Sequence, residues 1–199
     1  MTPLKVLRAA VLEFERRGLK YCLIGGHAAS LYRRSERLTK DVDFALLGDP
    51  PESSKKLAQA VISAIGLKPA LGFIPETQQP KGTSSLKMVT STPQSGAITG
   101  IIDILLPELP WIEDAVHRAQ LNKMDLLFAN VPIITPEDLI VAKAYALKNA
   151  PDRFQDLDDL KEIFTADLTL DVEYILLKLN KHRLNFPEVV LPFVPKRLK

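Results

Sequence analysis

Two glycines and two acidic residues are the residues of this chain whose types and spacing could carry chemistry. Gly25 and Gly26 directly follow an apolar run, Tyr21–Ile24, and Asp41 and Asp43 open another. Residues two apart on a strand point to the same face, roughly 6.6 Å apart along the chain. The two carboxylates are therefore expected to face one spot, and that spot requires positive charge.

A third acid lies in a similar setting. Asp103 interrupts the apolar segment 97–106, AITGIIDILL. A buried carboxylate costs several kcal/mol unless it is paired, protonated or bound to a metal. If the strands are neighbours, Asp41, Asp43 and Asp103 converge, and their repulsion raises at least one pKa until a divalent cation binds. Oxygen ligands favour Mg²⁺ or Mn²⁺ over zinc, and two such ions would activate an attacking hydroxyl and stabilise leaving pyrophosphate.

The glycine pair ends a predicted strand and precedes a predicted helix over His27–Ser35. Backbone N–H groups and the helix dipole at such a junction favour an anion such as phosphate, although glycines also serve purely geometric turns. The basic residues between the glycines and the acids are Arg33, Arg34, Arg37 and Lys40. The net charge of +2 is too small to indicate nucleic-acid binding by itself.

The rest of the chain must position these residues, and its periodicity predicts an α/β (α+β) fold: a small mixed β-sheet flanked by helices, followed by an α-helical C-terminal part. We expect a core over 1–134 and a helical region over 135–199 packed on it. Thr135, Pro136 and the acids after them mark a helix start. The predicted helices are 3–17, 53–65, 111–120, 139–148, 154–164 and 172–184. The predicted strands are 21–24, 41–47, 85–90 and 97–106, with a strand pair and mobile connection over 67–97 and a short pair over 123–134. The proline-punctuated end is expected to be extended.

Composition excludes several classes of protein. With 46% hydrophobic and 25% charged residues in 199, the chain can bury a core and is expected to be soluble. Its apolar runs are too short to span a membrane, and its first residues do not resemble a signal peptide, so we expect a cytoplasmic protein without a membrane partner. The single cysteine, Cys22, excludes an internal disulfide and a cysteine-rich zinc site.

These residues resemble a known family. A strand, Gly25-Gly26, a helix, the segment 37–44 (RLTKDVDF) and a later Asp103 resemble the DNA polymerase β-like nucleotidyltransferase superfamily. The chain is most similar to the bacterial AbiEii-type branch, abortive-infection toxins of toxin–antitoxin pairs. The resemblance covers about 20–106, and the segments 136–139 (PEDL) and 156–160 (DLDDL) are similar to that branch's C-terminal signatures. Most superfamily members have serine where this chain has Gly26.

The resemblance implies roles for particular residues. Gly25 and Gly26 would help to hold a nucleoside triphosphate, and Asp41 and Asp43 would bind both metal ions. Asp103 would assist the nucleophile and would also belong to the metal site.

Three further residues, Arg37, Thr39 and Lys143, are candidates for nucleotide binding. Arg37 and Thr39 could also merely hold their loop, and Lys143 could be a snorkelling surface lysine on an apolar helix face. Asp156 and Asp159 share one helix face, where they fit either a role in the site or an ordinary ion-paired helix with Arg153 as partner.

The implied activity is Mg²⁺-dependent (or Mn²⁺-dependent) transfer of a nucleoside monophosphate from an NTP to an acceptor hydroxyl, with release of pyrophosphate. The acceptor stays open between a tRNA 3′ end, a protein hydroxyl and a small molecule such as an aminoglycoside. An antitoxin partner is also implied. The alternative is a catalytically silent module that binds nucleotide or a partner protein; the complete set of three acids argues against it. Kinase-type phosphotransfer is disfavoured because the glycines lack a P-loop Lys-Ser/Thr.

Overall fold

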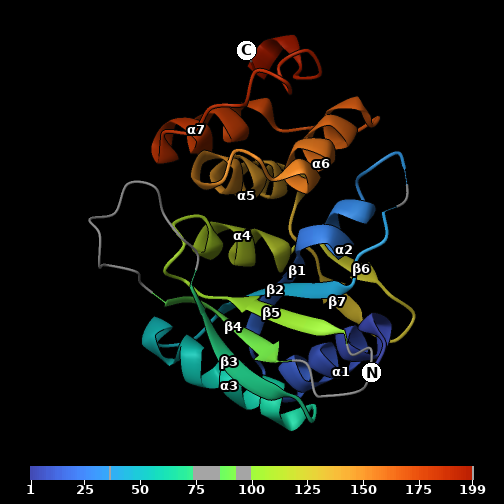
Figure 1. Cartoon of the computed structure of the whole chain (residues 1–199), viewed down its shortest axis with the longest axis vertical. Helices are drawn as coiled ribbons and strands as arrows, with labels where there is room; N and C mark the ends of the chain where they lie inside the picture. The colour runs from blue at the N-terminus through green and yellow to red at the C-terminus, as the bar shows by residue number, and fades with distance from the viewer. Residues whose placement is uncertain (36, 74–85, 93–99, 199) are drawn as a thin grey trace.

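The computed structural model describes residues 1–35, 37–73, 86–92 and 100–198. Within these residues, the main element is a five-stranded sheet with strand order β1-β2-β5-β4-β3 (Figure 1). Its strands are β1 (Lys20–Ile24), β2 (Asp41–Leu47), β3 (Lys68–Phe73), β4 (Leu86–Thr92) and β5 (Ile101–Leu105). β2 and β5 are parallel and the other neighbours antiparallel, so the predicted mixed sheet is confirmed.

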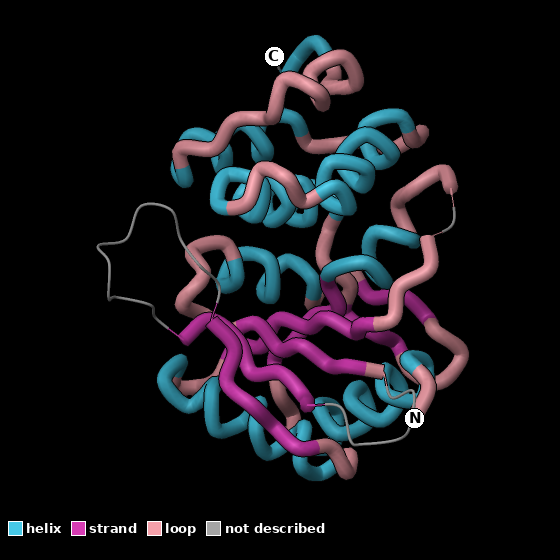
Figure 2. The backbone as a smooth tube through the Cα atoms, viewed as in Figure 1, coloured by secondary structure: helices cyan, strands magenta, loops and turns pink. Residues whose placement is uncertain are grey.

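Helices cover both faces of this sheet (Figure 2). The helices are α1 (Pro3–Arg16), α2 (Gly25–Ser30), α3 (Ser54–Ala64), α4 (Ile112–Ala119), α5 (Pro136–Asn149), α6 (Phe154–Thr165) and α7 (Val172–His182), with short 3₁₀ turns η1 (Pro51–Ser53) and η2 (Lys196–Leu198). α1 and α3 pack on one face, and α2 and α4 on the other. A small antiparallel pair, β6 (Lys123–Asp125) and β7 (Asn130–Pro132), lies beside β1.

The α1 face of the sheet holds the aromatic part of the core. Phe14 of α1 stacks on Tyr21 of β1 and meets Phe44 of β2 edge-on. Since side chains alternate along a strand, Val42 and Phe44 face α1 while Asp41 and Asp43 face the opposite side. The alternation of β2 therefore directs its two acids away from the core and toward the helices of the C-terminal part.

The C-terminal helices form a layer beyond α2 and α4 (Figure 1). α5 begins as predicted, because the Thr135 side chain accepts a hydrogen bond from the Asp138 N–H and Pro136 occupies the first turn. Arg118 of α4 joins this layer through ion pairs with Asp138 and Glu137. The proposed division of the chain after residue 134 stays a prediction.

Most predicted helices and strands are present, with bounds shifted by a few residues. The predicted strand pair within 67–97 is β3–β4, while the connection predicted to be mobile, residues 74–85, and the start of the predicted strand at 97–99 lie outside the described residues. No helix in the described ranges is long and apolar enough to cross a membrane.

Two predictions are wrong. The helix predicted over His27–Ser35 is α2, which begins at Gly25 and ends at Ser30, so the glycine pair forms its first turn. The chain end is not extended: from Pro187 onward it folds into successive turns and η2, which packs on α7. The spacing explains this, because Val190, Val194 and Leu198 recur every four residues and all three are buried.

Candidate active site

A row of paired residues crosses four strands at the centre of the sheet. Ile24 of β1 pairs with Asp43 of β2, Asp43 with Asp103 of β5, and Asp103 with Thr90 of β4. Residues directly paired across neighbouring strands share a face, with about 4.8 Å between the strands. The register thus places Asp43 and Asp103 side by side. Asp41, two positions before Asp43 on β2, lies on the same face.

This arrangement leaves Asp43 in an unfavourable electrostatic environment. Burial, the neighbouring Asp103 and the neighbouring Asp41 raise the pKa of Asp43 from 3.8 to about 7. The backbone N–H of Gly26 and the Lys143 ammonium act in the opposite direction on this pKa. A buried carboxyl whose pKa is raised in this way, despite the Lys143 ammonium, is a favourable site for a divalent cation.

Asp103 also has a raised pKa, chiefly because of burial and in smaller part because of Asp41. The Thr90 hydroxyl donates a hydrogen bond to Asp103 Oδ1 and lowers the same pKa. Sequence reasoning missed Thr90, which only the pairing of β4 with β5 brings to the site.

The two glycines allow close approach of the β2 acids. Gly25 has φ +63°, and a Cβ at this position would lie 2.0 Å from Asp43 Oδ2. A Cβ on Gly26 would lie 3.0 Å from Thr39 Oγ1. Thr39 itself donates to the Asp41 backbone oxygen at 3.2 Å. The glycine pair therefore has a steric reason that is independent of any ligand: it admits the Asp43 carboxylate and the loop before β2.

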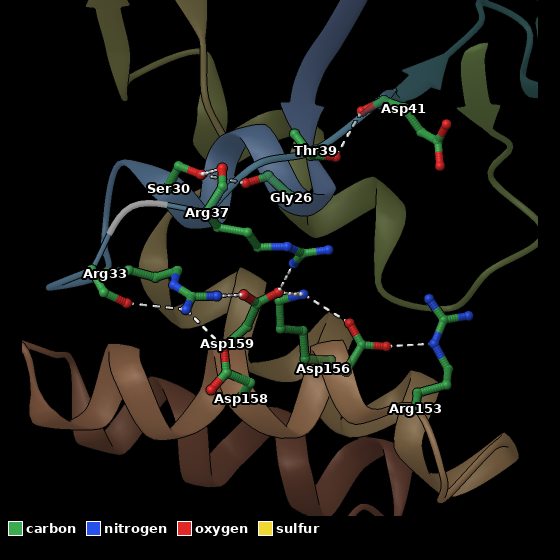
Figure 3. A network of polar contacts seen from close by, with 12 residues as sticks. Gly26, Ser30, Arg33, Arg37, Thr39, Asp41, Arg153, Asp156, Asp158 and Asp159 are labelled. Atoms are coloured by element: carbon green, nitrogen blue, oxygen red, sulfur yellow. Dashed lines mark hydrogen bonds and ion pairs between the residues drawn. The ribbon is translucent and has the colours of Figure 1, made fainter. Parts of the chain in front are cut away.

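A buried ion-pair network links this loop to α6 (Figure 3). Asp159, whose side chain is 0% exposed, pairs with Arg33 and Arg37 from the segment after α2 and with Lys143 of α5, the last at 2.6 Å between Nζ and Oδ2. Lys143 is buried, so the snorkelling surface alternative is wrong. Arg33 also pairs with Asp158, so the three cations around Asp159 are largely neutralised within the network.

A second acid of α6 continues the network. Asp156 accepts from Lys143 Nζ at 2.8 Å and pairs with Arg153 at 2.5 Å, as the i, i+3 spacing predicted. The pKa of Asp156 is lowered because these two cations outweigh its burial. Asp156 and Asp159 are thus more than an ordinary helix-surface ion pair: they hold cations from α5 and from the loop before β2.

All of the predicted site residues line one pocket of about 620 Å³ between the sheet and α5. They are Gly25, Gly26, Arg37, Thr39, Asp41, Asp43, Asp103 and Lys143. Lys40, Arg153 and Asp156 also line it, together with apolar side chains of β4, β5, the segment after β5 and α5. Sequence reasoning did not identify this apolar lining, because it comes from elements that meet only in the folded chain.

The donor chemistry of the site fits Mg²⁺ or Mn²⁺. Asp41, Asp43 and Asp103 offer carboxylate oxygens at one side of the pocket, and the raised pKa of Asp43 shows that its ionised form lacks compensation. Among the described residues, no three His, Cys, Asp or Glu side chains are already arranged to hold a metal ion. A divalent cation would offset the mutual repulsion of these carboxylates when it binds.

Comparison with known proteins gives a family match over nearly the whole chain. The family model described as nucleotidyl transferase AbiEii toxin, type IV TA system, matches residues 6–198. A sequence comparison with curated proteins gives no significant match.

Two solved structures are similar in fold. One is a solution structure of the antibiotic-resistance factor ANT(2'')-Ia, with a TM-score of 0.53 and 14% identity, covering 92% of this chain and 93% of that chain. The other is a crystal structure of ANT(2")-Ia in complex with adenylyl-2"-tobramycin, with a TM-score of 0.54 and 15% identity, covering 89% of this chain and 95% of that chain. At this level of identity the likeness concerns the fold alone.

Proposed function

The chain belongs to the AbiEii family of nucleotidyl transferases, and from this premise we propose that it moves a nucleoside monophosphate from an NTP to an acceptor hydroxyl with the aid of Mg²⁺ or Mn²⁺. Its fold is the nucleotidyltransferase fold, as the sequence predicted. The observation that carries the proposal is one pocket lined both by the three acids and by Arg37 and Lys143.

The proposed roles follow from the chemistry of each side chain. Asp41 and Asp43 would hold the divalent ions, with Asp103 contributing to the same site; the ions would supply charge neutralisation of the triphosphate and of the leaving pyrophosphate. The acceptor oxygen forms a bond to the α-phosphorus while the bond to pyrophosphate breaks. Asp103 takes or directs the acceptor's proton, and its raised pKa makes it a stronger base than an exposed aspartate.

Arg37 and Lys143 would bind the phosphates. Both line the pocket and both are held by Asp159, so they are fixed in place before a substrate arrives. Preorganised cations stabilise charge without reorganisation during the reaction. Gly25 and Gly26 would let the phosphates approach the backbone, and Thr39 would hold the loop that carries Arg37.

The proposed acceptor and partner rest on the family match rather than on the geometry of this site. We propose a tRNA or other RNA end, or a protein hydroxyl, as acceptor, and an antitoxin as partner, because the family is described as a type IV toxin. The similar ANT(2")-Ia was solved with adenylyl-2"-tobramycin, so a small-molecule hydroxyl belongs in any acceptor screen. We also propose a cytoplasmic location.

Calorimetric titration tests the proposal against a catalytically silent module. Each NTP is titrated into the protein with Mg²⁺ and with EDTA, using the wild type, Asp41→Asn and, as a matched control, Asp167→Asn at an exposed position. The proposal predicts Mg²⁺-dependent NTP binding by the wild type and the control, and its loss in Asp41→Asn. NTP binding that is unchanged both by the removal of Mg²⁺ and by the Asp41→Asn substitution would overturn the proposed metal role.

A further inference from the structure

The pocket extends along α5 beyond the phosphate-binding cations. Ala142, Lys143, Ala146 and Asn149 all line it, at the spacing of one helix face. Asn149 follows Lys143 by six positions, which corresponds to roughly 9 Å along the helix axis. The two alanines have small side chains, so this part of α5 leaves room in the pocket.

Apolar side chains from a second segment line the same pocket. Leu109 and Trp111, from the segment between β5 and α4, line the pocket together with Tyr145 of α5. Leu109 and Trp111 are nearly fully buried, and they contribute an apolar wall to the pocket. Small-molecule sites in proteins typically combine such apolar walls with a few placed polar groups.

Asn149 supplies the polar group. Its Nδ2 donates one hydrogen bond to the Tyr145 backbone oxygen at 3.0 Å, within α5. An amide side chain has two N–H groups and an accepting oxygen. One N–H and Oδ1 thus remain for a ligand, and they present a donor and an acceptor side by side, which matches the paired donor and acceptor on the edge of a nucleobase.

We propose that this slot, formed by Leu109, Trp111, Ala142, Tyr145, Ala146 and Asn149, binds the base of the nucleoside triphosphate, and that Asn149 selects among bases. This inference rests on the proposed function. The base is favoured over the acceptor as occupant because it is joined to the phosphates through one sugar. It must therefore lie in the same pocket, within one sugar of the α-phosphate, and α5 carries both Lys143 and the residues of this slot.

Binding assays that compare ligands carrying a nucleobase with a ligand that lacks one test the inference. The dissociation constants of the four NTPs and of inorganic tripolyphosphate are measured with Mg²⁺ for the wild type, Asn149→Ala and Ala146→Leu. Asn180→Ala, at an exposed position of α7 outside this pocket, is the matched control. Thermal unfolding of each variant confirms that it is folded.

The wild type and the control should bind the preferred NTP roughly tenfold more tightly than the least preferred one, the size expected for one good amide–base pair. Asn149→Ala should reduce this preference to less than about threefold. Ala146→Leu should weaken all four NTPs by filling the slot. Neither variant should change the affinity for tripolyphosphate.

Other results overturn the inference. Equal binding of the four NTPs by the wild type, an unchanged preference in Asn149→Ala, or an equal loss of tripolyphosphate binding in either variant would each contradict it while leaving the proposed function standing. Failure of the wild type to bind any NTP or tripolyphosphate would contradict both.

Discussion

Replacing Asp43 by Asn should make the metal-free protein more stable at pH 8. The pKa of Asp43 rises from 3.8 to about 7 on folding, chiefly because burial and the nearby Asp103 disfavour its charge. At about 1.36 kcal/mol for each pH unit between these values, ionised Asp43 costs the folded state about 4 kcal/mol. Asn removes the charge and its Oδ1 can still accept a hydrogen bond from the Gly26 N–H, so most of this cost should disappear.

The sign of the pH dependence follows from the direction of the shift. Because the folded pKa is the higher one, the folded protein holds a proton that the unfolded chain has released between pH 3.8 and about 7. Wild-type stability due to this group is therefore highest below this window and falls as the pH rises through it. The advantage of Asp43→Asn should be about 4 kcal/mol at pH 8 and about 1.5 kcal/mol at pH 5.

Urea unfolding in EDTA at the two pH values measures this difference. Asp167→Asn, an exposed substitution, serves as control and should change stability by less than about 0.5 kcal/mol at either pH. Added Mg²⁺ should then stabilise the wild type and not Asp43→Asn, since binding to the folded state alone raises stability. An Asp43→Asn protein that is no more stable than the wild type at pH 8, or equally stabilised at both pH values, would refute the reasoning.

Two further substitutions test the surroundings of this site, each with a matched control in urea unfolding. Gly25→Ala should lower the free energy of unfolding by about 3 kcal/mol or more, because its Cβ would meet the Asp43 carboxylate. Gly18 has a similar positive φ with nothing near the added Cβ, so Gly18→Ala should lower it by only about 1 kcal/mol. Equal losses would show that the close approach to Asp43 is unimportant. Asp159→Ala should lower the free energy of unfolding by about 3–5 kcal/mol, because it leaves three buried cations without their shared partner. Asp158→Ala removes a carboxylate that is 41% exposed and should lose less than about 1 kcal/mol, so a similar loss in both would contradict the assignment of the network to Asp159.

The sequence predicts the strand that carries the β2 acids because its pattern is local. Val42 and Phe44 alternate with Asp41 and Asp43, and alternation alone assigns the acids to the face away from the core. Asp103 is found for a related reason, since a single carboxylate in an apolar strand needs an explanation. The N-terminus of α5 is equally local, with Thr135 as cap.

Features that depend on long-range pairing could not be predicted in this way. The register that sets Asp103 between Asp43 and Thr90 comes from the pairing of β5 with β2 and with β4, and nothing local encodes it. The network around Asp159 joins α5 and α6 to the loop before β2, and Arg33 in that loop is more than 100 residues from Asp159. The sequence therefore reveals only that Asp159 and Asp156 share a helix face. The apolar slot near Asn149 likewise forms only when α5 packs over the sheet.

The central claim is that the three-acid pocket transfers a nucleoside monophosphate, and the fate of labelled phosphates tests it most directly. The protein is incubated with Mg²⁺, with pools of tRNA, protein and small-molecule acceptors, and with NTPs labelled at either the α- or the γ-phosphate. Nucleotidyl transfer predicts that the α label, and not the γ label, joins the acceptor, that labelled pyrophosphate leaves from the γ-labelled NTP, and that Asp41→Asn and Asp43→Asn abolish both. Transfer of the γ label, or undiminished α-label transfer by these two variants, would contradict the account.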